Sequence, residues 1–424
     1  MSVSWTNIML GEAGHWFSGG TPSKANASMW EGLVPWVSPK DMKRARIGDA
    51  VDHVAEVAIG SGTQAVPPHT LLMVVRGMIL AHSFPVALTT RRVTFNQDIK
   101  ALIPRSDISP EFLLYWLQSK TASVLKLTDV ANHGTKRLPT ELLFGMQLPV
   151  PPLPEQLKIA AILSSIDDTI ETTQAVIHQL QVVKKAMMVE LLTRGLPGRH
   201  TRFKQTEIGE MPEEWEVLSV ADIGPGDRPT AQTGPFGAQL RPEDFVEAGV
   251  PVLKIGNVRW GFLRLNDLDF VRPEKAKELS RFRVRHGDLL FARQGATTGR
   301  NALADERCDG WLINYHLIRV ATDHARCLPE FLMACFNSDL VQRQVGREKG
   351  RGNRDGINTA NILSFRLPLP AMEEQRRITE MLARLDQARA ANEMQREQLE
   401  RTKSALMSVL LTGDLRVLPE ASSP

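Results

Sequence analysis

The chain has 424 residues, about three times the length of a typical single domain, so we expect at least two domains. It is 42% hydrophobic and 23% charged, with 30 glycines and 26 prolines, which excludes a disordered, collagen-like or wholly coiled-coil protein. A net charge of +3 is too small to indicate nucleic-acid binding by itself.

The sequence suggests a cytoplasmic protein. The first residues lack the basic segment and apolar run of a signal peptide, and no apolar stretch reaches the roughly 18 residues of a membrane span. Cys308, Cys327 and Cys335 form neither a metal-ligand pair nor an even disulfide set. We therefore expect a reduced protein without a membrane-spanning helix.

Residues 1–147 are predicted to form a globule of mixed structure. A β-like run at 34–37 stands among Gly, Pro and Asp turns. The segment 109–120, SPEFLLYWLQSK, has apolar residues at helical spacing and predicts a helix.

Residues 148–205 are predicted to form a long helix followed by a linker. Pro154 suits the first helical turn, and Glu155 complements the positive end of the helix dipole. A seam with alternating spacings of four and three residues indicates a heptad pattern, made by Ile159, Leu163, Ile166, Ile170, Thr173, Ile177, Leu180, Lys184, Met187 and Leu191.

Residues 206–366 and 367–424 repeat this organisation as a second globule and a second helix with a tail. Residues 148–196 match 367–415 at 17 of 49 positions without a gap, and at an offset of 218 Gly77 and Asn96 align with Gly295 and Asn314. The second seam is apolar at its ends and polar in its middle: Ile378, Leu382, Leu385, Arg389, Asn392, Arg396, Leu399, Lys403, Leu406 and Leu410.

The predicted fold class is α+β, with two similar mixed α/β domains separated by two long helices. The seams favour an antiparallel coiled coil within a pseudo-twofold internal repeat. The alternative is that each helix packs only on its own globule. Two diverged globules in one chain could read two half-sites of duplex DNA, but a protein-binding scaffold would fit the same pattern.

No sequence motif assigns a reaction to this chain. The nearest match to a phosphate-binding loop, residues 295–300, has the wrong spacing and no lysine, and neither GxGxxG nor HExxH occurs in a suitable context. The carboxylate pairs Asp167-Asp168 and Glu373-Glu374 fit solvated helix faces and helix dipoles better than acid–base catalysis. We predict neither catalytic residues nor metal ligands.

Several motifs, in order and partly duplicated, resemble the specificity subunit of type I restriction–modification systems over essentially the whole chain. They are SGGTPS (18–23), the proline-rich helix starts with Glu155-Gln156 and Glu374-Gln375, LLT at both helix ends, PEEWEV (212–217), GPFGAQL (234–240) and VPVLKIGNV (250–258). The chain departs from a strict repeat in two places. The first globule has no sequence counterpart to 234–237, and Ala371-Met372-Glu373 replaces Pro152-Leu153-Pro154.

The resemblance implies a non-catalytic subunit whose two target recognition domains read a bipartite double-stranded DNA site. It also implies two modification (methyltransferase) subunits and restriction (translocase/endonuclease) subunits as partners. S-adenosylmethionine, ATP and Mg would belong to those partners, and no cofactor to this chain. A protein-binding coiled-coil scaffold and an enzyme with an unrecognised site remain the alternatives.

Candidate DNA contacts are polar and basic residues at repeat-related loop positions, because base edges need donors and acceptors while Lys and Arg bind phosphates. They are Lys40, Asp41, Arg76, Asn96, Gln97, Lys136 and Arg137 in the first half, and Lys254, Asn257, Arg293, Gln294, Asn314, Arg351 and Arg354 in the second. Basic loops at 40–46, 135–137, 281–285 and 347–354 favour phosphate contact. Solvated side chains are the alternative, and Asn96 and Asn314 could instead bond local backbone.

Candidate residues of the coiled coil or of a partner interface lie at the helix starts and along the seams. They are Glu155, Gln156, Ile159, Leu163, Ile166, Leu191, Glu374, Gln375, Ile378, Leu382 and Leu410.

Overall fold

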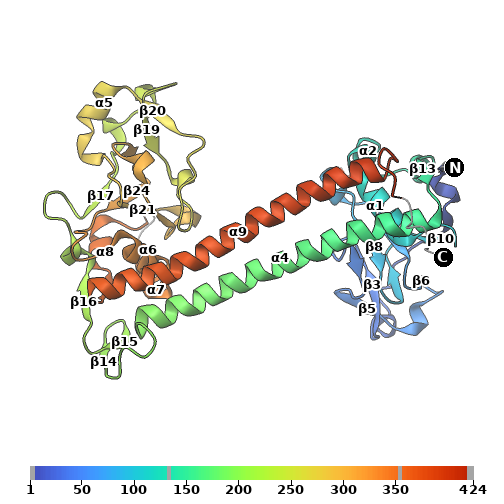
Figure 1. Cartoon of the computed structure of the whole chain (residues 1–424), viewed down its shortest axis with the longest axis horizontal. Helices are drawn as coiled ribbons and strands as arrows, with labels where there is room; N and C mark the ends of the chain where they lie inside the picture. Colours follow the sequence, from blue (N-terminus) through green and yellow to red (C-terminus); the bar gives the residue numbers. More distant parts are fainter. Residues whose placement is uncertain (1–4, 131–134, 352–355, 418–424) are drawn as a thin grey trace, which may run out of the picture. The chain divides into compact units, whose positions relative to one another are not determined.

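The computed structural model describes residues 5–130, 135–351 and 356–417 (Figure 1). The chain divides into two compact units, residues 1–175 with 393–424 and residues 176–392. Each unit contains one globule of mixed structure and one segment of paired helices. The predicted α+β fold is confirmed.

The first globule contains two sheets and three short helices. The larger sheet has the order β2 (Gly14–Ser18), β10 (Ile99–Pro104), β7 (Leu71–Val74), β8 (Val86–Thr89) and β4 (Arg46–Ile47). The smaller has the order β5 (Asp52–Val54), β3 (Val34–Val37), β9 (Val93–Phe95) and β6 (Ala65–Val66). Two ribbons pair β1 (Thr6–Met9) with β13 (Gln147–Val150) and β11 (Asp129–Val130) with β12 (Lys136–Arg137). The helices are α1 (Pro110–Ser119), α2 (Thr121–Lys126) and α3 (Thr140–Phe144).

The helix predicted at 109–120 is α1. Ser109 caps it by accepting a hydrogen bond from the backbone N of Phe112 at 3.3 Å, and Pro110 occupies the first turn. The apolar face that follows is fully buried against the sheet strands. This prediction is confirmed.

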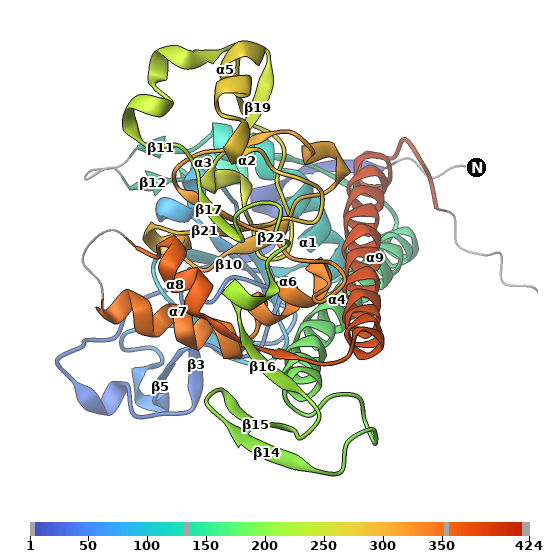
Figure 2. The same ribbon diagram turned by 90° about the vertical axis from the view of Figure 1, so that its left-hand side faces the viewer.

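The second globule has the corresponding sheets, of which the one with β17 and β21 lies between a layer that holds α5 with β19 and the helices α7 and α8 (Figure 2). One sheet has the order β17 (Ala231–Thr233), β24 (Leu317–Val320), β21 (Leu289–Ala292) and β22 (Asn301–Leu303). The other has the order β18 (Phe245–Val246), β20 (Asp269–Val271), β19 (Val250–Leu253) and β23 (Leu312–Ile313). Ribbons pair β14 (Phe203–Thr206) with β15 (Gly209–Pro212) and β16 (Glu216–Ser219) with β25 (Arg366–Leu369). The helices are α5 (Pro273–Glu278), α6 (Pro329–Asn337), α7 (Asp339–Arg351) and α8 (Thr359–Ser364).

The strand pairing reproduces the internal repeat. The order β2-β10-β7-β8 recurs as β17-β24-β21-β22. In the smaller sheets, β3 pairs antiparallel with β5 and parallel with β9, and β19 pairs in the same way with β20 and β23. The two globules therefore share one topology.

The apparent lack of a counterpart to residues 234–237 is wrong at the level of the backbone. A Cβ on Gly234 would collide with the carbonyl oxygen of Asn314, and a Cβ on Gly19 would collide with that of Asn96. The SGGTPS segment thus occupies the same position as GPFG. The two segments share the close backbone approach that requires glycine, but little else.

The two long helices are α4 (Leu153–Thr193) and α9 (Met372–Leu410). They pair antiparallel within each unit, since Ile159 shares a core cluster with Leu410 and Leu191 shares one with Ile378. Every predicted seam position is buried or half-buried. The alternative, in which the helices pack only on their own globules, is therefore wrong.

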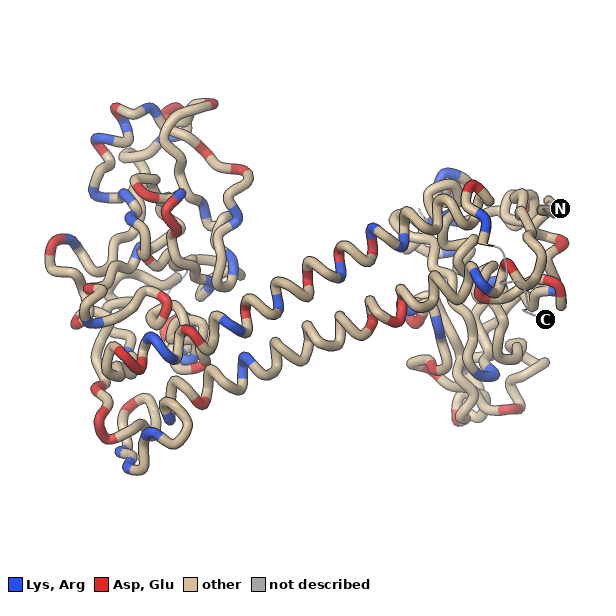
Figure 3. Tube along the Cα trace, viewed as in Figure 1, with Lys and Arg blue, Asp and Glu red and all other residues tan. Residues whose placement is uncertain are grey.

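Charged seam residues form ion pairs between the helices. In the first unit Lys403 Nζ lies 2.7 Å from Asp167 Oδ1, and in the second Lys184 Nζ lies 2.6 Å from Asp386 Oδ1. Figure 3 shows charges of both signs along α9, whereas the middle of α4 carries few. Lys184 and Lys403 thus have carboxylate partners on the opposite helix.

Candidate nucleic-acid interface

The predicted DNA residues of the first globule gather where β3, β7 and β9 end. The backbone N of Asn96 donates to the carbonyl oxygen of Val37 at 2.9 Å, which joins the loops after β9 and β3. Arg76 forms a β-bridge with Arg137, and the N of Gly77 donates to the carbonyl oxygen of Lys136 at 3.0 Å. The loops that carry these candidates are therefore joined by backbone contacts. Whether they contact DNA stays a prediction.

The second globule gathers the equivalent loops. The N of Asn314 donates to the carbonyl oxygen of Leu253 at 3.0 Å, and the N of Arg293 donates to that of His316 at 3.1 Å. The N of Ile357 donates to the carbonyl oxygen of Arg293 at 3.0 Å. We call these two loop clusters the reading loops.

Two predicted residues hold equivalent turns in the reading loops. Asp41 Oδ2 accepts a hydrogen bond from the N of Ser38 at 2.9 Å after β3, and Asn257 Oδ1 accepts one from the N of Lys254 at 2.7 Å after β19. Asn257 is only 2% exposed, and its Nδ2 donates to the carbonyl oxygen of Arg264 at 2.9 Å. These side chains fix the loop backbone. Whether they also touch DNA stays a prediction.

Asn96 and Asn314 make the contacts expected of turn asparagines. Each Oδ1 accepts a hydrogen bond at 3.1 Å from the backbone N two residues ahead, of Asp98 and His316 respectively. Asn96 is buried and also donates to Asp98 Oδ2. This arrangement fits the local-backbone alternative that the sequence left open.

Arg293 is a buried side chain in a loop otherwise open to solvent. Its Nε donates to the carbonyl oxygen of Ile357 at 2.8 Å, and its Nη1 donates to that of Tyr315 at 3.4 Å. The neighbouring Gln294 Oε1 lies 2.7 Å from His316 Nδ1. Burial, and after it the guanidinium of Arg293, lowers the pKa of His316, which keeps that imidazole neutral near pH 7.

Two of the basic candidates already have carboxylate neighbours. Lys40 Nζ lies 2.6 Å from Asp52 Oδ2, and Lys254 Nζ lies 2.9 Å from Asp269 Oδ1. The hydrogen bond to the carboxylate is the main cause that raises the pKa of each lysine. These ammonium groups therefore stay charged, as phosphate contact requires.

The remaining basic candidates lie beside the loops. Arg76 and Arg137 are exposed, Gln97 is exposed, and Lys136 is half-buried in β12. Arg351 is the last residue of α7, and its side chain is not described. Arg354 lies outside the described residues.

An exposed aromatic pair in the second reading loops was missed by the sequence analysis. Phe236 and Tyr315 are 53% and 41% exposed, with ring centroids 6.2 Å apart. The equivalent positions in the first globule hold Thr21 and Gln97, which hydrogen-bond to each other through Oγ1 and Oε1. The offset of 218 that aligns Asn96 with Asn314 also aligns Gln97 with Tyr315, so the repeat alignment could have identified Tyr315 as a candidate.

Glu155 and Glu374 begin the long helices as buried carboxylates. Glu155 accepts hydrogen bonds from Trp5 Nε1 at 3.1 Å and from Arg416 Nε at 2.7 Å. Glu374 accepts one from Trp215 Nε1 at 3.2 Å and lies 2.9 Å from His200 Nε2. Each carboxylate joins a helix start to the first residues of its globule and to the segment after the other helix.

Gln156 and Gln375 tie the same helix starts to the globules. Each Oε1 accepts a backbone N–H just before a globule helix, from Ser109 at 2.8 Å and from Leu328 at 2.9 Å. Both amides are 0% exposed. We call each Glu-Gln pair with these partners a clamp. The side-chain amides of Gln156 and Gln375 also donate to backbone carbonyl oxygens, so the hydrogen bonds of the clamps are made within the chain.

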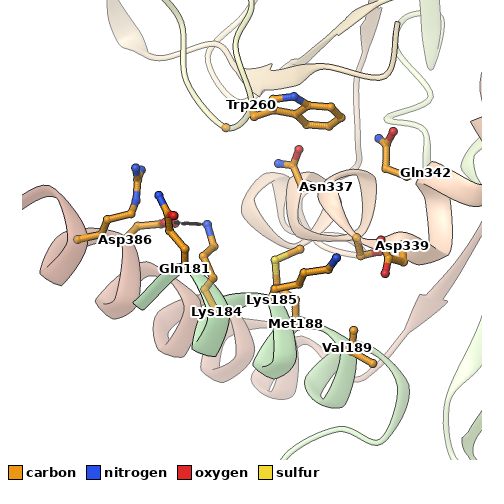
Figure 4. Close-up of a pocket in the computed structure, with 13 residues that line it drawn as sticks. Gln181, Lys184, Lys185, Met188, Val189, Trp260, Asn337, Asp339, Gln342 and Asp386 are labelled. Carbon is orange, nitrogen blue, oxygen red and sulfur yellow. Dashed lines mark hydrogen bonds and ion pairs between the residues drawn. The ribbon is translucent and has the colours of Figure 1, made fainter. Parts of the chain in front are cut away.

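A pocket of about 510 Å³ lies where the second globule meets the helices of its own unit (Figure 4). The indole of Trp260 faces Asn337 on the globule side, and Lys185 and Met188 of α4 lie on the helix side. Lys184 bonds Asp386 across the helix pair at the edge of this pocket.

Among the described residues, no group of three or more His, Cys, Asp or Glu side chains could hold a metal ion. Within the same residues, no helix is both long and apolar enough to cross a membrane.

Comparisons with known proteins give one family. The family described as "Type I restriction modification DNA specificity domain" matches residues 2–182 and 212–401. The type I restriction enzyme MjaVIII specificity subunit of Methanocaldococcus jannaschii is 25% identical over 418 residues, covering 97% of this chain and 93% of that protein.

Two solved structures have the same fold. The type I restriction–modification S subunit from M. genitalium superposes with a TM-score of 0.57 at 13% identity, covering 96% of both chains. A structure concerning complex assembly and conformational transition of the type I R-M system gives a TM-score of 0.59 at 15% identity, covering 97% of this chain and 98% of the other.

Proposed function

The chain belongs to the type I restriction–modification DNA specificity family as a specificity subunit, and from this premise we propose that each of its two recognition domains reads one half of a bipartite duplex site. Such subunits are non-catalytic DNA-recognition components. We call residues 5–150 the first recognition domain and residues 203–369 the second.

The observation that carries this proposal is the contrast between shared backbone and different side chains. Gly19 and Gly234 hold their loops against Asn96 and Asn314 in the same way. On that common frame one domain presents Thr21 with Gln97 and the other presents Phe236 with Tyr315. Hydroxyl and amide groups suit hydrogen bonds to base edges, whereas aromatic rings suit apolar contact with a thymine methyl group.

Affinity would come from the basic side chains around the reading loops. Lys40, Arg76 and Arg137 in the first domain and Lys254 in the second would contact phosphates, which position a protein on DNA without specifying sequence. The half-buried Asp41 and the buried Asn257 and Arg293 would act on DNA through the loop conformation that they hold.

The same proposal assigns the chemistry to partners. Two modification subunits would supply methyl transfer with S-adenosylmethionine, and restriction subunits would supply ATP- and Mg-dependent cleavage. This chain would bind none of these cofactors and would act on DNA in the cytoplasm.

Methylation mapping tests the proposal. Genomic DNA is compared from a host that expresses the modification subunits with and without this chain. A split methylated motif that appears only with the chain supports the proposal. Methylation that does not depend on the chain, or an unsplit motif, contradicts it. Salt-insensitive or absent DNA binding by the assembled complex would favour the scaffold alternative.

A further inference from the structure

A second basic site lies at the far end of the sheet from the second reading loops. β21 runs from Leu289 to Ala292, with Arg293 and Gln294 following it at the reading loops. Before β21, the segment 280–285 lines a pocket of about 430 Å³. Five arginines line this pocket: Arg228, Arg281, Arg283, Arg285 and Arg319.

Arg319 is a buried cation in this pocket. It is 2% exposed, and its Nη1 and Nη2 donate to the carbonyl oxygens of Arg283 at 3.3 Å and Pro229 at 3.1 Å. Within the described residues its Nε has no hydrogen-bond partner. Burial lowers the pKa of Arg319, and Arg228 and Arg285 add to this effect against the opposing charge of Asp288. A buried guanidinium remains charged and therefore favours a nearby anion.

Three carboxylates lie at the pocket, those of Asp227, Asp288 and Asp309, and the first two pair with arginines. Arg228 bonds Asp288 through two nitrogens at 3.0 and 2.6 Å, and Arg285 Nη1 bonds Asp227 Oδ2 at 2.8 Å. The guanidinium of Arg281 lies over the ring of Phe282, 4.4 Å from its centroid. Arg283 Nη1 donates to the carbonyl oxygen of Gly310 at 3.2 Å. In the described part of the chain, neither Arg281, Arg283 nor Arg319 forms an ion pair, so positive charge is in excess.

The fold itself does not require these charges. Leu290 pairs with Arg319 where, in the first domain, Leu72 pairs with Ala101. At the offset of 218, the positions of Arg283, Arg285 and Asp288 hold Ala65, Pro67 and Thr70. His69 and Gly287 share a positive φ, of 62° and 85°, which confirms that these segments correspond. The same topology thus forms without a buried cation.

We propose that this pocket of the second recognition domain binds a phosphate group. The planar guanidinium groups of Arg281 and Arg283 can donate paired hydrogen bonds to phosphate oxygens, and Arg319 supplies charge from beneath. The phosphate is either a phosphodiester of duplex DNA or a free phosphate such as that of a nucleotide. The DNA source rests on the proposed function, whereas the free source does not.

Inorganic phosphate tests the site on the full chain. At constant ionic strength, balanced with chloride, phosphate should raise the thermal midpoint of the wild type with a saturable dependence. The double variant Arg281→Gln with Arg283→Gln should lose this shift, and so should Arg319→Ala, which installs the residue of the first domain. The control Arg202→Gln with Arg307→Gln removes two exposed arginines that pair with Glu213 and Asp305, and should respond as the wild type does.

A duplex longer than the target distinguishes the two sources. If the phosphate belongs to DNA, the slope of log affinity against log salt should flatten by about one for each contact that the double variant loses. If the site binds free phosphate instead, the double variant should have the same salt slope as the control variant but should lose the phosphate-induced shift in thermal midpoint. Two results would overturn the site. In the first, phosphate gives the wild type no saturable shift in thermal midpoint and the double variant keeps the wild-type salt slope. In the second, the phosphate shift persists in both pocket variants. If the wild-type complex shows no preference among DNA sequences, that result would contradict only the proposed function and not the phosphate site.

Discussion

Side-chain chemistry differs at equivalent positions of the two recognition domains although their backbones correspond. Thr21 and Gln97 make a polar pair, whereas Phe236 and Tyr315 make an aromatic pair of which each ring is about half exposed. Because the two pairs differ in chemistry on a shared backbone, we propose that each pair reads bases in its own half-site.

The first prediction concerns these pairs. Phe236→Ala with Tyr315→Ala should lower discrimination in the second half-site by about 1–3 kcal/mol per base pair contacted, because apolar base contacts are lost. The measurement is competition binding of the assembled complex with duplexes altered in one half-site at a time.

Thr21→Ala with Gln97→Ala is the matched variant, and it should affect only the first half-site. If either double variant changes discrimination in both halves equally, the pairs do not read bases separately.

The second prediction concerns phosphate contact by the first domain. Arg76→Ala with Arg137→Ala should weaken cognate and non-cognate binding alike and flatten the salt slope by about two, since two exposed guanidinium groups are removed. Arg91→Ala with Arg92→Ala removes the same charge before β9, away from the reading loops, and should leave the slope unchanged. A selective loss of cognate binding would instead identify Arg76 or Arg137 as a base reader.

The repeat in the sequence predicted which loops lie together, but not the contacts that each of their residues makes. The repeat aligns Asn96 with Asn314, and it aligns Arg76 with the segment at Arg293. It could not show that Arg293 is buried, because its partners, the carbonyl oxygens of Ile357 and Tyr315, come from distant segments. The exposed rings of Phe236 and Tyr315 were missed because, in a sequence, an exposed aromatic residue resembles a core residue.

At the scale of elements, the clamps explain why Glu-Gln follows both proline-rich helix starts. The amides of Gln156 and Gln375 fix each helix to its globule, and Glu155 and Glu374 bind the segment after the other helix. Hydrogen bonds within each helix do not set the register between the two helices, so a buried polar contact at each helix start adds specificity.

The third prediction concerns the clamp of the first unit. Glu155→Gln should lower the free energy of unfolding by about 1–3 kcal/mol, because it removes a buried charge-assisted hydrogen bond from Arg416. The exposed Glu171→Gln on the same helix is the control and should change it little. Urea unfolding of the full chain at pH 7 measures both.

The same carboxylate predicts acid sensitivity. The hydrogen bond from Arg416 is the main cause that lowers the pKa of Glu155 below its usual value of 4.5. The unfolded chain therefore takes up this proton first, so the contribution of Glu155 is complete above about pH 4.5 and is lost as the pH falls through the lowered pKa. Glu155→Gln should show a flatter decline in urea midpoint over that range, and a decline as steep as that of the wild type would contradict this assignment.

The heptad seam is the element that sequence alone predicted best. Its periodicity depends only on local spacing, and Ile159, Leu191, Ile378 and Leu410 are buried as expected. The ion pairs that accommodate its polar members, such as Lys184 with Asp386, depend on antiparallel register and could not be read from one helix alone.

At the scale of the molecule, α4 and α9 run without a break through the boundary between the two units, at residues 175–176 and 392–393. The fourth prediction treats this helix pair as a spacer. A heptad added to each helix at that boundary keeps the seam in phase and lengthens each helix by about 10 Å. The unspecified centre of the target should then grow by about three base pairs of ~3.4 Å each. An unchanged spacer with full methylation would contradict the spacer hypothesis.

The central claim is that each recognition domain reads its own half-site. Exchange of residues 1–150 for the corresponding domain of a related specificity subunit tests it directly, because all the reading loops of one domain are replaced at once. The exchanged segment also includes Trp5 and Ser109, which contact Glu155 and Gln156 at the start of α4. The methylated motif is then mapped in a host that supplies the modification subunits. The account predicts a new sequence in one half of the motif and the original sequence in the other. A motif that changes in both halves, or in neither, would contradict it.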